Sequence, residues 1–124
     1  MNGKYLLIPL ALGWLLLSSP AVMADTAMQE MVGIMLRLHH YPDDADMVTL
    51  KKIINDSATS EDDRTIAAAL TRMHHTVTDD DKAKLLDISH NEAAPAADRE
   101  VAEILANMHH KASADARAEL EKLK

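Results

Sequence analysis

The chain has 124 residues, of which 20 are acidic and 13 basic, so its formal net charge is −7 at pH 7. This length fits one small domain, and because the chain has no cysteine it has neither disulfides nor thiolate metal ligands. Only 2% of its residues are aromatic, and an acidic surface poor in stacking side chains repels phosphate groups, which excludes nucleic acid as an expected partner.

The first 24 residues have the pattern of a secretory signal peptide. Lys4 precedes an apolar run over residues 5–17, which is too short for a comfortable membrane span. Val22 and Ala24 have the small side chains that signal peptidase requires. We therefore expect cleavage after Ala24, export to the periplasm or the medium, and no membrane segment afterwards. Cleavage removes Lys4 and no acidic residue, so the net charge falls from −7 to −8.

A unit of 35 residues recurs along the rest of the chain. Its clearest mark is a pair of adjacent histidines, found at His39-His40, His74-His75 and His109-His110. Aligned at this offset, the second and third units share ten of 31 positions, and the first unit keeps the same apolar pattern with fewer identities. The predicted units span residues 24–58, 59–93 and 94–124, within one domain over residues 25–124.

Each unit predicts a hairpin of two helices. In the first unit one apolar face recurs at helical spacing, formed by Met28, Met31, Val32, Met35 and Leu38. In the second unit Ser60 and Thr78 are good N-caps for the two helices, and in the third Pro95 and Ser113 take these places. No segment alternates like a strand. The sequence therefore predicts an all-α fold of three repeated α-hairpins, either a short helical solenoid or a six-helix bundle.

The histidine pairs have two interpretations. As ends of helices they interact favourably with exposed carbonyl groups, because imidazolium is cationic. As metal ligands they must act between units, since adjacent residues of a helix point about 100° apart. Helical spacing from Leu70 and Leu105 predicts that the first histidine of each pair borders the buried face. We expect these three, His39, His74 and His109, to converge, with the outward-facing His40, His75 and His110 assisting them.

Two further patterns have simpler explanations. The spacing of Met28, Met31 and Met35 suits core packing, although thioethers with imidazoles also suit copper(I). Acidic runs at helix starts are explained by the helix dipole and lack the pattern of a calcium loop.

The histidine pairs have a third possible use, which is pH sensing. Protonation of six histidines at mildly acid pH would cancel most of the negative charge of the chain.

The sequence contains no combination of nucleophile, base and oxyanion donor, so we expect no enzyme and no required cofactor. The main hypothesis is an exported helical-repeat protein of the bacterial envelope that binds an unidentified envelope protein, one with a basic or polar surface. The alternative is a periplasmic protein that binds zinc, copper or nickel through the histidine pairs.

Overall fold

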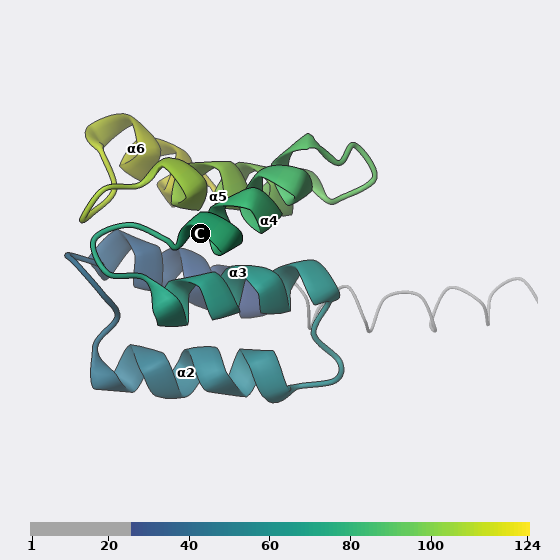
Figure 1. The fold of residues 1–124 in the computed structure, drawn as a ribbon, viewed down its shortest axis with the longest axis horizontal. Helices are drawn as coiled ribbons and strands as arrows, with labels where there is room; N and C mark the ends of the chain where they lie inside the picture. The colour runs from purple at the N-terminus through teal and green to yellow at the C-terminus, as the bar shows by residue number, and fades with distance from the viewer. Residues whose placement is uncertain (1–25) are drawn as a thin grey trace, which may run out of the picture.

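The computed structural model describes residues 26–124, and these form an all-α bundle (Figure 1). Helices occupy residues 26–37, α2 (Asp44–Asn55), α3 (Glu61–Arg72), α4 (Asp79–His90), α5 (Ala96–Asn107) and α6 (Ala114–Lys122). This part of the chain has no strand, and none of its helices is long and apolar enough to cross a membrane. The expected signal peptide lies outside the described residues.

The predicted N-caps set the helix starts. The Ser60, Thr78 and Ser113 side chains each accept a hydrogen bond from the backbone N–H three residues later, at distances of 3.1 Å. Asp43 does the same for α2, at 2.7 Å. Each such cap stabilises its helix by about 1 kcal/mol. Pro95 precedes α5 without a side-chain cap, which suits a residue whose fixed φ already matches the helix.

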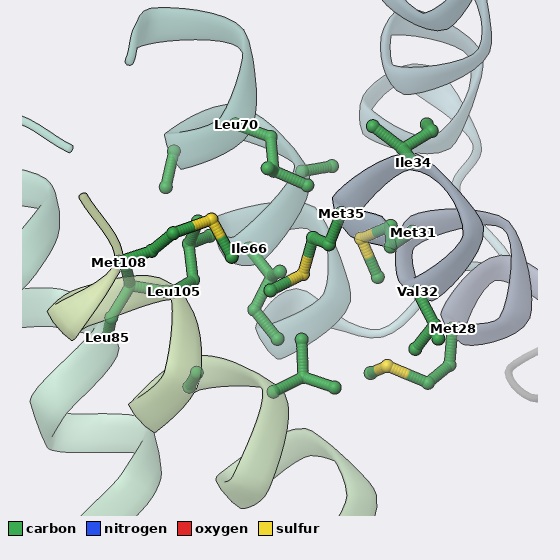
Figure 2. Packing of buried hydrophobic residues seen from close by; sticks show 14 of the residues in the cluster. Met28, Met31, Val32, Ile34, Met35, Ile66, Leu70, Leu85, Leu105 and Met108 are labelled. Carbon is green, nitrogen blue, oxygen red and sulfur yellow. The ribbon is translucent and has the colours of Figure 1, made fainter. Parts of the chain in front are cut away.

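The first helix of each unit supplies most of the core. Equivalent positions on residues 26–37, α3 and α5 are fully buried, as at Met31, Ile66 and Val101. Figure 2 shows the labelled side chains of this cluster, with Met35 beside Ile66. The second helices contribute fewer residues, chiefly one fully buried leucine each at Leu50, Leu85 and Leu120. The methionines expected on the first helix are buried in this core, so their predicted packing role is confirmed.

The bundle closes on itself. Among helices α2 to α6, the most extensive contacts join α2 to α3 and α4 to α5, so these two second helices pack against the first helix of the following unit. The last helix returns to the first unit, where Arg117 Nη2 donates a hydrogen bond to the Leu36 carbonyl at 2.9 Å. Of the two predicted arrangements, a solenoid or a bundle, the structure therefore has the bundle. The loops that follow residues 26–37, α3 and α5 gather at one end of it, at the left of Figure 1.

Candidate metal centre

The histidine pairs lie beyond the helix ends. Helix α3 ends at Arg72 and α5 at Asn107, and their C-caps are Met73 and Met108, which are buried. The pairs that follow are exposed and belong to the loops. The prediction that the pairs form the helix ends is wrong, because the chain becomes extended at the buried methionine that follows each of these two helices.

A tight reversal brings the second histidine of a pair to the tip of its loop. The Thr76 N–H donates to the His74 carbonyl at 2.7 Å, and the Lys111 N–H donates to the His109 carbonyl at 2.7 Å. This hydrogen bond between residues i and i+2 closes a γ-turn centred on the second histidine. The central residues have left-handed φ angles, 67° at His75 and 64° at His110. Such a φ costs a non-glycine residue about 1–2 kcal/mol.

Backbone hydrogen bonds tie the three loops together. The His75 N–H donates to the His40 carbonyl at 3.1 Å, and the His110 N–H donates to the His75 carbonyl at 2.7 Å. The second histidines of all three units are thus linked in series through their main chains. These bonds fix the positions of the three loop backbones relative to one another.

The imidazole rings of His40, His75 and His110 form a triad. Their ring centroids are 4.9, 4.9 and 4.6 Å apart, and the rings meet edge to face. The Nδ1 atoms of His75 and His110 are separated by 3.0 Å, and one ring nitrogen from each of the three histidines lies within 4.8 Å of the others. The three ring centroids therefore form a nearly equilateral triangle. All three side chains are exposed to solvent.

The expected site used the other member of each pair. His39, His74 and His109 are exposed rather than at the border of the core, and they do not join the cluster. The His74 ring instead lies near Tyr41, with ring centroids 6.3 Å apart. The prediction that the first histidines converge is wrong because it assumed a continuing helix. The γ-turns at His75 and His110 reverse the chain, and the rings of these two histidines meet the ring of His40.

The electrostatic environment favours the neutral form of His110. The pKa of His110 is lowered by desolvation and by repulsion from His75, His40 and His109. A lowered pKa keeps the imidazole neutral, which is the form that binds metal. The helices of residues 26–37, α3 and α5 all end next to the triad, and their dipoles are negative at this end.

The geometry suits a tetrahedral transition-metal ion. Zn–N bonds of about 2.0–2.1 Å place ligand nitrogens about 3.3 Å apart, close to the 3.0 Å between the Nδ1 atoms of His75 and His110. The ring nitrogen of His40 lies within 4.8 Å of the other two and would have to come closer to complete the set. Three imidazoles leave a fourth position open toward solvent, where water binds. No protein-family model matches the chain, and comparison with curated proteins and with solved structures also gave no match.

A second titratable cluster lies among the helix starts of α3 and α5. Asp63 and Asp98 occupy equivalent positions in their units and are both buried. Burial and the neighbouring Asp98 raise the pKa of Asp63 to about 7, so this carboxyl group is mostly protonated only below that pH. In the first unit Met28 takes the equivalent place and lines the same pocket. The sequence identity of the two aspartates marked this pair, but the capping pattern alone did not predict its burial.

Proposed function

We propose that this protein binds one divalent transition-metal ion through His40, His75 and His110. The observation that carries the proposal is the meeting of three imidazoles from three separate loops, with a nitrogen of each within 4.8 Å of the others. The left-handed φ angles of His75 and His110 add to it. A strained backbone at two of the three positions is typical of sites where the side chain has a function.

The donor set favours zinc, copper(II) or nickel. Neutral imidazole suits all three ions, and the open fourth position accepts water or an exchanging ligand. Copper(I) is a weaker candidate, because the thioethers of Met28, Met31 and Met35 are buried in the core. Among the three ions, the general order of stability predicts the tightest binding for copper(II).

An exposed site is suited to holding and releasing an ion, and we propose this non-enzymatic role. If the first 24 residues are removed by signal peptidase, as expected, the site lies in the periplasm or the medium. There, a solvent-facing triad exchanges its ion with other ligands. Metal binding or buffering in the cell envelope is therefore the function that the geometry supports best.

Calorimetric titration of residues 25–124 with Zn²⁺, Cu²⁺ and Ni²⁺ tests this proposal. We expect one ion per chain and a dissociation constant below about 1 μM at about pH 7.5, with binding lost at about pH 5.5. Replacing His40, His75 and His110 with alanine abolishes the saturable signal. Replacing the first histidines, His39, His74 and His109, is the matched control and leaves it intact. Equal loss in both triple variants, or unsaturable heats in the unchanged chain, would overturn the proposal.

A further inference from the structure

In the first two units an ion pair joins the end of the first helix to the start of the second. Arg37 Nη2 lies 2.6 Å from Asp46 Oδ1. Arg72 binds Asp81 through two nitrogens, Nε at 2.9 Å and Nη2 at 2.6 Å. The hydrogen bonds from Arg72 lower the pKa of the buried Asp81 carboxyl group. The guanidinium group therefore spans the space between the two helices in both units.

The third unit lacks both partners of this pair. Asn107 and Ala116 occupy the equivalent positions, and Asn107 donates its side-chain hydrogen bond to the Glu103 carbonyl at 2.9 Å. A groove of about 600 Å³ lies between α5 and α6 at this place. Its apolar lining comes from Ile104, Met108, Ala112 and Ala116. The opening is thus located where arginine and aspartate meet in the other two units.

The same groove is lined by acidic groups that the second unit lacks at the equivalent positions. Glu100, Glu103 and Glu119 line it, whereas the equivalent residues of the second unit are Thr65, Ala68 and Lys84. Burial and a hydrogen bond with Glu119 raise the pKa of Glu100, so carboxyl groups from α5 and α6 meet across the groove. Compared with the second unit, the third unit therefore has no guanidinium group at this place and has three more carboxylates around it.

Two cations of the chain lie at this groove: the exposed Lys111 lines it, and Lys122 pairs with Glu119. Lys122 Nζ lies 3.0 Å from Glu119 Oε1, and 69% of the Lys122 side chain is exposed. An exposed pair of this kind contributes little to stability and is easily exchanged. Lys122 is therefore no barrier to a cation that enters between Glu100 and Glu119.

We infer that the groove between α5 and α6 binds an arginine side chain presented by a partner protein. The methylene groups of the arginine would lie on the apolar lining, and its planar guanidinium would bind the glutamates in two places at once. Lysine lacks this planar fork and fits less well. A protein-borne arginine is favoured over the free amino acid, because the free carboxylate would lie close to the three glutamates.

The probe is N-acetyl-arginine-N-methylamide, in which the guanidinium is the only charge. Nuclear magnetic resonance titration of metal-free residues 25–124 should give saturable shifts confined to the residues around the groove. The corresponding lysine derivative should bind at least about fivefold more weakly. Equal binding of the two probes, or shifts spread over the whole surface, would overturn the assignment. Tighter binding of free arginine than of the blocked probe would overturn the protein source of the ligand.

The double variant Asn107→Arg/Ala116→Asp is the decisive test. It rebuilds the ion pair that two other units already have, so it should fold normally, and circular dichroism checks this. We expect its affinity for the blocked arginine to fall at least about tenfold, because the internal guanidinium occupies the groove. Unchanged affinity in this folded variant would refute the proposal.

Two further variants separate charge from shape. Glu100→Gln/Glu119→Gln keeps the groove but removes two carboxylates, and it should also lose binding. Arg72→Asn/Asp81→Ala removes the ion pair from the second unit, which has no acidic lining. This matched control should keep the affinity of the native groove and gain no second site. A second site in the control would show that an open space alone suffices and would refute the role of the glutamates.

Discussion

The Nδ1 atoms of His75 and His110 lie 3.0 Å apart, although 35 positions separate the two residues in the chain. At this distance one ring must hold a proton and the other a lone pair, so the two nitrogens share one hydrogen. Two imidazolium rings cannot keep this contact. A metal ion that replaced the shared proton would keep both rings in place, and His40 would be its third ligand.

Metal affinity should therefore depend steeply on pH. Desolvation and the neighbouring histidines lower the pKa of His110, so this ring stays neutral to a lower pH than an isolated histidine. As the pH falls through this lowered value, protonation of the rings displaces the ion. Titration of zinc affinity between about pH 8 and pH 5 measures the effect. Affinity that stays constant across this range would contradict coordination by imidazole.

Glycine at the tips of the γ-turns should separate stability from metal binding. His75→Gly/His110→Gly relieves two left-handed φ angles, of 67° and 64°, and glycine adopts them without strain. We expect chemical denaturation to show a free energy of unfolding unchanged or raised by about 1 kcal/mol, while calorimetry shows no metal binding.

The control for this prediction is His74→Gly/His109→Gly in the same loops. These positions have no left-handed φ, so glycine only adds freedom to the unfolded chain and should lower the free energy of unfolding by about 1 kcal/mol. Metal binding should persist. If the free energy of unfolding falls equally in both double variants, the left-handed φ angles do not destabilise the fold.

The buried aspartate pair should make the fold less stable at alkaline pH. The pKa of Asp63 is about 7, against an ordinary value of 3.8, so the folded protein binds a proton that the unfolded chain releases. Stabilisation by this group is complete below about pH 4 and is lost as the pH rises through about 7. The free energy of unfolding should therefore fall between about pH 5 and pH 8.

The variant Asp63→Asn isolates this effect. The amide imitates the protonated carboxyl group and donates to Asp98, so stability at about pH 8 should rise by an amount on the order of 3 kcal/mol. Thermal unfolding over the pH series provides the measurement. Asp79→Asn, at an exposed position in the first turn of α4, is the control and should not change the slope. A slope that survives Asp63→Asn would assign it to another group.

Local rules predicted the helices well. The caps Ser60, Thr78 and Ser113 could be predicted from the sequence because each side-chain oxygen accepts a hydrogen bond from a backbone N–H only three residues away. The buried methionines followed from helical spacing in the same way. Such features depend on a few neighbouring residues, and the repeat presents them three times.

The candidate metal centre was harder to predict, because the sign of φ at His75 and His110 decides which histidine of each pair joins the cluster. The 35-residue spacing made both members of each histidine pair equivalent between units, and helical geometry selected the wrong member. A left-handed φ usually signals glycine, and although histidine is enriched among the other residues that adopt it, this preference is too weak to predict it at His75 and His110. The closure of the bundle also depends on the distant contact between Arg117 and Leu36, which no local pattern encodes.

The ion pair of the second unit should stabilise the fold in a way that acid removes. Asp81 is buried and Arg72 is half-exposed, and hydrogen bonds from Arg72 lower the pKa of the carboxyl group. A lowered pKa contributes stability above the unfolded value of 3.8, and this contribution disappears as the pH falls through the folded value. Arg72→Ala leaves a buried carboxylate without its partner and should lower the free energy of unfolding by about 1–3 kcal/mol at neutral pH. Adding Asp81→Ala should restore part of this loss, and a double-mutant cycle measures the coupling. Arg99→Ala, which lies outside this pair, is the control for the loss of an arginine. If the decreases in the free energy of unfolding caused by Arg72→Ala and Asp81→Ala are additive, the two side chains have no coupling energy.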